Sequence, residues 1–452
     1  MPSIFLTSNT RVTATANALK LPKPEVIALF RLKSDYSGEF GFDWIRCGDT
    51  AYFWDTDYED VVKKHFTDAT ETTFEMDGNE KGGHYAAVLD LDGKSFQYEA
   101  LKRQYAKFSL PWAELNDDGD LIPAEYIVPW VSLYKDCSAE LNIKVVISRG
   151  ADHLAFDSND NYLIEPSVID VKGKNGQEDL DVTLRITCIE EHTADLELVM
   201  RAYKNERPAA LELVMQAYDS EGFENESEGV LAGKLKMWAN GPAKRKKKKV
   251  VFVQVLTPEI VPGEGERSYD PSNEKVRVNS YTRQALIELD EDSEVITMDL
   301  IEEDDFGQFI LNGRVVNRST VDDSTLDAYL KTKLGLEKDG KFDATFFKAF
   351  YFGEGGLSGA SGGGLSGYSR LGADFVVVFS SANQQTASHE ILHSFNLPHS
   401  FTNKESSGHA LFTYEALKTE NLLDYSHQVT GHTNDRRSLW YWQWVKANDS
   451  IT

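Results

Sequence analysis

The segment ADFVVVFS (373–380), followed closely by HEILHSFNLPH (389–399), decides the fold of the C-terminal part of this chain. The β-branched run in the first segment predicts a buried strand. In the second segment His389 and His393 are four residues apart, so on an α-helix both imidazoles lie on one face and can reach one metal ion. A strand followed by a helix that carries metal ligands predicts an α+β domain built around a metal site.

The residues around this pair of histidines extend it into a catalytic type of site. Asn396 follows the helix, and Asn is the commonest residue other than Gly that tolerates the left-handed conformation in which many helices end. Pro398 is typical of positions beyond a helix end, and the returning chain would bring His399 to the same metal. Three histidines with an open water position form the ligand set of a catalytic zinc. Glu390 is placed to take a proton from the metal-bound water.

HEILHSFNLPH resembles the zinc-binding helix of metzincin metalloproteases. The resemblance implies that Zn²⁺ is the cofactor, with His389, His393 and His399 as its ligands. It also implies that Glu390 is the catalytic base. The family has Gly where this chain has Asn396, a change that keeps the backbone argument intact.

A second match lies downstream in NLLDY (421–425). It is similar to the tight turn with Met that metzincins hold below the metal, with Leu423 in the place of Met. Tyr425 falls where astacin-like and serralysin-like members keep a Tyr that binds the metal or stabilises the oxyanion. A gluzincin-like alternative would use a downstream glutamate ligand, Glu415 or Glu420. The other nearby histidines are expected on the surface or in loops: His409, His427 and His432.

The metzincin resemblance implies a zinc-dependent endopeptidase that hydrolyses peptide bonds of a protein substrate. Zn²⁺ lowers the pKa of its bound water toward 7 and polarises the scissile carbonyl. Glu390 then passes the water proton to the leaving amine. Metzincin substrates pair with the edge strand upstream of the zinc helix, and the strand at 373–379 is expected to fill that role.

The pattern along the chain predicts three domains, the first two all-β and sandwich-like. Residues 1–125 contain short aromatic runs punctuated by Gly, with a hairpin turn at Asp92 and Gly93. Residues 126–257 contain β-branched strands separated by polar turns, as in a β-sandwich. From 258 to 452 strands and helices alternate, which predicts an α+β metzincin-like domain.

Three smaller features are expected to be structural. LELVMRAY (196–203) recurs as LELVMQAY (211–218), which predicts a local duplication into two adjacent strands. The basic run KRKKKK (244–249) is expected to be a solvated hairpin arm. RCGD (46–49) is similar to the RCG core of the matrixin cysteine switch, but a free Cys47 in a strand is the simpler interpretation.

The composition limits the partners. The chain has 73 acidic and 47 basic residues, a net charge of -26, which argues against a general nucleic-acid binder. Its three cysteines exclude a disulfide framework. No run approaches the roughly 18 apolar residues of a membrane span. The first 20 residues lack the apolar stretch of a secretory signal, so we expect synthesis in the cytoplasm and no membrane insertion.

The N-terminal half contains no catalytic cluster. VPWVSL (128–133), GKLKMWAN (233–240) and VVFVQV (250–255) resemble accessory β-domains that precede metallopeptidase or toxin domains in Bacteroidota proteins. Some of those proteins are linked to contractile, type VI-like secretion. The resemblance implies an exported effector with a secretion-apparatus carrier, whose β-rich half either restrains the protease or docks it. The alternative is a binding or structural component of such an apparatus with a degenerate protease domain.

Overall fold

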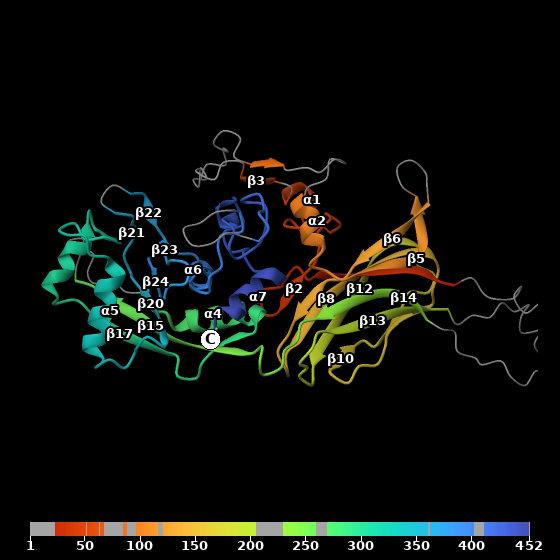
Figure 1. Ribbon diagram of the computed structural model, residues 1–452, viewed down its shortest axis with the longest axis horizontal. Helices are drawn as coiled ribbons and strands as arrows, with labels where there is room; N and C mark the ends of the chain where they lie inside the picture. The colour runs from red at the N-terminus through yellow and green to blue at the C-terminus, as the bar shows by residue number, and fades with distance from the viewer. Residues whose placement is uncertain are drawn as a thin grey trace, which may run out of the picture.

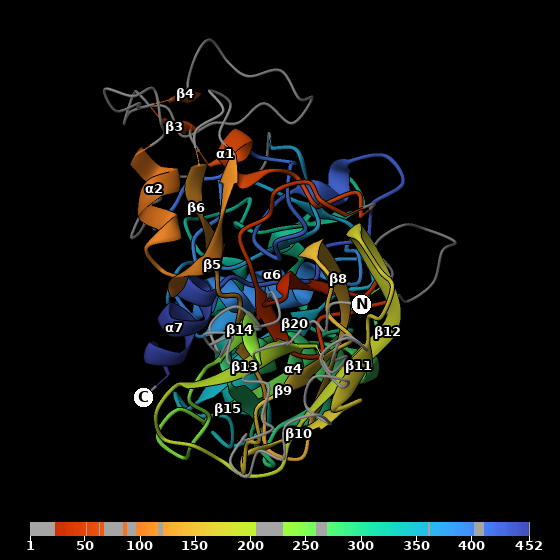
Figure 2. The same ribbon diagram turned by 90° about the vertical axis from the view of Figure 1, so that its right-hand side faces the viewer.

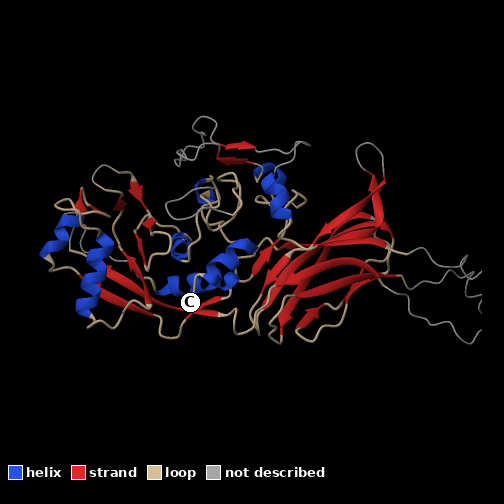
Figure 3. Cartoon of the chain, viewed as in Figure 1, coloured by secondary structure: helices blue, strands red, loops and turns tan. Residues whose placement is uncertain are grey.

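The computed structural model describes residues 23–50, 52–62, 64–66, 85–87, 96–115, 121–204, 229–258, 269–359, 362–401 and 411–451. Strand is more frequent than helix over these residues, which confirms the β-rich composition expected from the sequence. The molecule is elongated, with a β-sandwich at one end and a mixed sheet covered by helices at the other (Figures 1 and 3).

Two sheets face each other in the sandwich end. The first has the order β1 (Glu25–Leu32), β8 (Ser138–Arg149), β12 (Gly176–Cys188), β10 (Tyr162–Glu165). The second has the order β11 (Val168–Asp170), β9 (His153–Phe156), β13 (Leu196–Tyr203), β14 (Val230–Met237), β7 (Trp130–Ser132), β2 (Gly41–Asp43). Alternate residues of β1 are buried, and Phe30 shares one core with Ile143 of β8 and Leu235 of β14. This alternation is what a strand with one buried face requires.

The first predicted domain boundary is wrong. β1 pairs along its length with β8, and β2 pairs with β7, so residues 25–43 complete the sandwich expected at 126–257. They do not belong to a separate domain over residues 1–125. A strand pattern shows which face of a strand is buried but not which distant strand it joins.

Between β2 and β7 the chain adds further described elements. They are α1 (Tyr58–Val61), β3 (Lys64–Phe66), β4 (Tyr85–Ala87), α2 (Phe96–Lys102), β5 (Lys107–Leu115) and β6 (Leu121–Ile127). Of these, α1, α2, β3 and β4 lie toward the top of Figure 2. β5 and β6 form an antiparallel hairpin. Figure 2, which faces the sandwich end, shows α2 beside this hairpin.

The other end is built on a sheet with the order β16 (Ile287–Leu289), β15 (Lys246–Leu256), β20 (Phe346–Tyr351), β24 (Phe375–Val378), β23 (Gly367–Tyr368), with β17 (Glu294–Asp299) also paired to β15. All its pairings are parallel except that of β23 with β24. The predicted boundary at 257/258 is therefore wrong as well, because β15 is a central strand of this sheet. We call residues 246–451 the α/β part.

Helices cover both faces of this sheet. They are α4 (Ser272–Thr282), α5 (Leu326–Glu337), α6 (Thr386–Ser394) and α7 (Tyr441–Asp449), with short 3-10 turns η2 (Arg283–Ala285), η3 (Asp304–Phe309) and η4 (Ser426–Gln428). Val250 and Phe252 of β15 join a core with α4, α6 and α7, while Val251 and Val253 join a core with α5. Both faces of β15 are thus buried, as is usual for parallel strands.

Two short strands of the Gly-rich stretch before α6, β21 (Gly356–Leu357) and β22 (Gly364–Leu365), join a small sheet with residues 310–316. Its strands follow the order β18 (Ile310–Leu311), β19 (Arg314–Val316), β21, β22. At Gly356 a Cβ would lie 2.3 Å from the ring of Phe379, so a side chain there would displace this hairpin.

One apolar core joins the sandwich end to the α/β part. Tyr58, Trp130 and Trp238 share this core with Trp440 and Trp444 of the C-terminal segment. Close aromatic contacts cross the boundary, including a stack of Trp130 on Tyr441 with ring centroids 4.0 Å apart. The two parts are therefore packed as one body.

The basic run at 244–249 is not a solvated arm. Lys246 to Lys248 open β15 and pair with β16. Two charges of the run form ion pairs with acidic residues, with Arg245 2.7 Å from Glu191 and Lys249 2.5 Å from Asp292.

The remaining sequence expectations concern the cysteines, the repeated segment, the turn at Asp92, His409 and membrane-spanning helices. All three cysteines are free. LELVMRAY is β13, whereas its copy at 211–218, the turn at Asp92 and His409 fall outside. No described helix is both long and apolar enough to cross a membrane.

Candidate metal centre

Helix α6 presents two of the predicted ligands from a buried face. It packs on the α4 side of the sheet, where Ala387, Ile391 and Leu392 enter the core. His389 and His393 are 3% and 7% exposed, so both side chains are largely shielded from bulk water.

The predicted helix end at Asn396 is confirmed. Asn396 has φ +64, in the left-handed region. Its N–H donates to the carbonyl of His393 at 2.9 Å, and the N–H of Leu397 donates to the carbonyl of Leu392 at 3.2 Å. These two bonds form a Schellman motif, which turns the chain back toward the helix.

The left-handed residue gives a stability prediction. Replacing Asn396 by Ala should lower the free energy of unfolding by about 1 kcal/mol relative to Asn396→Gly, because a Cβ without a polar group is strained at positive φ. Denaturant unfolding of the metal-free variants measures the difference. Ala and Gly at Asn434, which is not at positive φ, serve as the control. Equal midpoints at 396 would contradict the strain argument.

The reversal brings His399 to the helical pair. The Nε2 atom of His393 lies 3.1 Å from that of His389 and 3.2 Å from that of His399. The ligand atoms of all three histidines lie within 4.8 Å of one another. All three residues predicted as metal ligands are therefore brought together.

The outer nitrogens of the helical pair are held by carbonyls. Nδ1 of His389 lies 2.7 Å from the carbonyl oxygen of Leu422, and Nδ1 of His393 lies 2.7 Å from that of Leu397. A carbonyl only accepts, so each Nδ1 carries the proton and each neutral ring turns an unprotonated Nε2 toward the centre. Burial, with the neighbouring His393 and Arg436, holds the pKa of His389 well below its ordinary value.

This arrangement fits a zinc ion. A tetrahedral zinc with Zn–N bonds of about 2.0–2.1 Å places its ligand nitrogens roughly 3.3–3.4 Å apart, close to the two distances to Nε2 of His393. Two unprotonated nitrogens facing each other at 3.1 Å have no hydrogen bond to share. Carbonyls on the far ring nitrogens are the usual supports of metal-bound histidine.

The NLLDY turn (421–425) lies next to the site, since the carbonyl of Leu422 accepts from Nδ1 of His389. The side chain of Asn421 accepts from the N–H of Leu423 at 2.9 Å, and the N–H of Asp424 donates to the carbonyl of Asn421 at 3.0 Å. The Leu423 side chain is fully buried. Its carbonyl accepts from the N–H of Ser400, the residue after the third ligand, at 3.1 Å.

Tyr425 lies beside the histidines. Its ring centroid is 4.8 Å from that of His399 and 5.9 Å from that of His389. The partly buried Glu390 lies next to β23, since a Cβ on Gly367 would be 3.3 Å from its Cγ.

The two glutamates of the gluzincin-like alternative are placed elsewhere. Glu420 is completely buried and forms an ion pair with Arg46. The backbone N–H of Glu415 donates to the carbonyl of Val61. Neither belongs to the group of converging ligand atoms found among the described residues.

The remaining candidates lie around the site without joining it. Cys47 is exposed and lies outside that ligand group, so a thiol blockade receives no support. His432 stacks on Phe53 and contacts Asp435 at 2.6 Å. Burial and the charge of Arg436 lower the pKa of His427 to about 3.

Sequence reasoning missed Arg436, which is 2% exposed. It donates to the carbonyl of Asp424 at 3.2 Å and to the side chain of Asn383 at 3.1 Å. Its Nη1 lies 3.1 Å from Nδ1 of His389. The shorter contact to the Leu422 carbonyl sets the tautomer of that ring. Burial lowers the pKa of Arg436 to about 10. No motif marks this residue, because the fold alone brings it behind the helix.

The expected edge strand also needs correction. β24, within the segment 373–379, has β20 on one side and β23 on the other. The strand at that end of the described sheet is β23, which runs antiparallel to its neighbour.

No protein-family model and no curated protein matches this chain.

Proposed function

We propose that this chain is a zinc-dependent endopeptidase of the metzincin type. The observation that carries the proposal is the convergence of three Nε2 atoms, two of them 3.1 Å and 3.2 Å from the third. Carbonyl acceptors behind two of the rings support a preorganised metal site. Three ligands leave one position open, as in catalytic zinc sites.

The side chains around the site supply the rest of the chemistry. Zinc, when bound, acts as a Lewis acid toward water and the scissile carbonyl. Glu390 takes the proton from the attacking water and delivers it to the leaving amine. Tyr425, beside His399, donates a hydrogen bond to the developing oxyanion.

The substrate in this proposal is an extended polypeptide. β23 ends the described sheet, and Gly367 within it lies against Thr386 and Glu390 of α6. A peptide that adds to this edge would run past the proposed base, and strand addition selects extended chains.

The metzincin-like fold assignment is part of the same proposal. A largely parallel sheet with an antiparallel edge strand and a zinc helix packed on one face supports it. Export as an effector by a contractile, type VI-like route, with a carrier in the secretion apparatus, is proposed from the resemblance of the N-terminal half alone.

The experiment is metal removal and return. Full-length protein should contain about one zinc per chain and cleave an unfolded protein substrate. Chelation should abolish cleavage, and added zinc should restore it. A zinc content far below one, together with no cleavage after zinc is added, would reject the protease. The alternative, a structural secretion component with a degenerate domain, would then stand.

A further inference from the structure

A buried carboxylate lies directly before the NLLDY turn. Glu420 has no exposed surface, and its backbone carbonyl accepts from the N–H groups of Arg437 at 2.8 Å and Ser438 at 3.3 Å. One carboxylate oxygen accepts from the hydroxyl of Ser438 at 2.8 Å. A buried charge is stable only when it is neutralised nearby.

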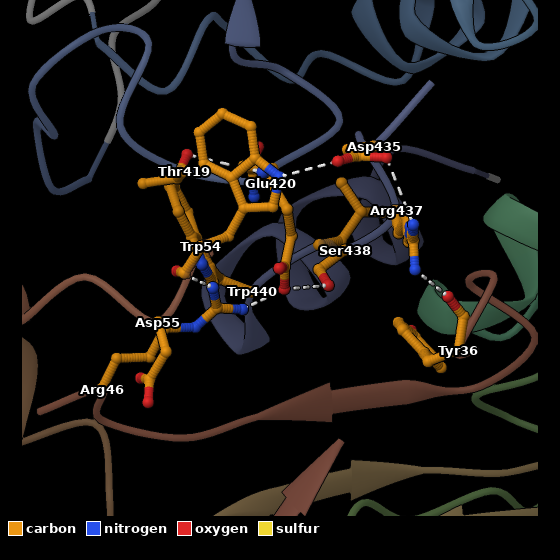
Figure 4. Close-up of polar contacts among 12 residues, drawn as sticks. Tyr36, Arg46, Trp54, Asp55, Thr419, Glu420, Asp435, Arg437, Ser438 and Trp440 are labelled. Carbon is orange, nitrogen blue, oxygen red and sulfur yellow. Dashed lines mark hydrogen bonds and ion pairs between the residues drawn. The ribbon is translucent and has the colours of Figure 1, made fainter. Parts of the chain in front are cut away.

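The neutralising cation comes from the other end of the sequence. Arg46 is 2% exposed, and its Nη2 donates to the same carboxylate oxygen of Glu420 (Figure 4). Its Nη1 donates to the carbonyl of Trp54 at 2.7 Å. The guanidinium carbon lies 4.3 Å from the ring centroid of Trp44 and 5.7 Å from that of Tyr58. The N-terminal segment thus contacts this arginine through one backbone carbonyl and two aromatic rings.

Further contacts fix the same junction. The Trp440 ring N–H donates to the hydroxyl of Tyr58 at 2.8 Å, and Arg437 donates to the carbonyl of Tyr36 at 2.7 Å. Asp435 accepts from Trp54 at 3.3 Å and from Arg437 at 3.2 Å (Figure 4). Residues 435–440, which hydrogen-bond to the backbone carbonyl of Glu420 through Arg437 and Ser438, are therefore contacted by the N-terminal residues at several points.

The NLLDY turn connects Glu420 to the proposed metal ligands. The residue after Glu420 is Asn421, whose side chain orders the turn through the N–H of Leu423. The next carbonyl, that of Leu422, holds Nδ1 of His389. The same turn carries the ring of Tyr425 beside His399. A displacement of Glu420 would move the support of one ligand and the proposed oxyanion donor together.

We infer that Arg46 is a positioning residue of the zinc site. By neutralising Glu420 it holds the NLLDY turn, so the N-terminal half is an obligatory part of the catalytic unit rather than a removable inhibitor. The effect of Arg46 on zinc binding rests on the proposed function, whereas its effect on the position of the NLLDY turn does not.

The experiment uses full-length variants. Arg46→Met leaves the Glu420 charge buried and unpaired, and a lone buried charge disrupts its surroundings. Arg46→Met with Glu420→Gln removes both charges and should recover most of the effect. Arg46→Lys retains a charge if the Met variant fails to fold. The matched control is Arg31→Met, which breaks the Arg31–Asp49 pair at 2.6 Å between β1 and the loop that follows Arg46.

Two readouts separate the inference from the proposed function. Hydrogen exchange of peptides within 411–428 in the metal-free protein should be at least about tenfold faster in Arg46→Met. It should be near wild type in the double variant and in Arg31→Met. In the zinc-loaded protein, zinc loss to a chelator should accelerate by about tenfold in the same pattern.

The outcomes are distinct. If Arg46→Met and Arg31→Met give the same exchange within 411–428, or the double variant shows no recovery, Arg46 is only a stabilising residue and the inference is overturned. If wild-type protein binds no zinc but the exchange pattern holds, the proposed function fails while Arg46 still holds the turn.

Discussion

Replacing His393 by Ala is expected to lower bound zinc from about one ion per chain to less than about a tenth under the same dialysis. His393 is the middle ligand, with its Nε2 next to both other ligand nitrogens. Its loss leaves two ligands that no longer surround the ion. Metal analysis by mass spectrometry measures the ratio.

The control for this prediction is His432→Ala, which removes a partly buried histidine from outside the ligand group. That variant should keep its zinc. Full occupancy in the His393 variant would show that the three histidines do not form the site.

Replacing Glu390 by Gln is expected to leave zinc content unchanged and to reduce kcat by roughly 10²- to 10⁴-fold, the range typical of a positioned general base. Gln has almost the same shape as Glu but cannot accept the proton. Initial rates on an unfolded protein substrate, normalised to bound zinc, provide the measurement. Unchanged turnover would show that Glu390 is not the base.

Tyr425→Phe supplies a graded comparison in the same assay. Loss of one oxyanion donor costs roughly 10²-fold or more in kcat, with zinc retained because the three histidines remain. A Phe variant with wild-type kcat would leave the ring of Tyr425 as a packing element beside His399.

The junction between the two ends of the molecule changes the expected role of the N-terminal half. A fragment that starts at residue 258 would lack β15, which pairs with β16, β17 and β20 in the centre of the sheet. It would also expose Glu420 by removing Arg46. Such a fragment is expected to be inactive because it cannot fold, so its inactivity would say nothing about inhibition.

The convergence of His389, His393 and His399 could be predicted from the sequence because their relative geometry is local. His389 and His393 share a helix face through the helical repeat. The chain reversal at Asn396 then returns His399, ten residues after His389, to the same face. These relations depend on backbone periodicity and on one left-handed residue. Neither requires knowledge of distant contacts.

Strand partners could not be predicted in the same way. The alternation in β1 showed a buried face but not that β8, more than a hundred residues away, would be its neighbour. The apolar run of β24 showed burial on both faces, yet only the sheet order reveals that β23 and not β24 lies at the end.

The sequence by itself determined the grouping of the three histidines and the left-handed end of helix α6, because each is set by residues within one or two turns of chain. Tertiary structure alone decided that Arg46 neutralises Glu420, 374 positions apart, and that Arg436 stands behind His389. Charged side chains are buried only where folding brings a partner to them. Which partner each one receives depends on how whole sheets pack, not on the neighbouring residues in the sequence.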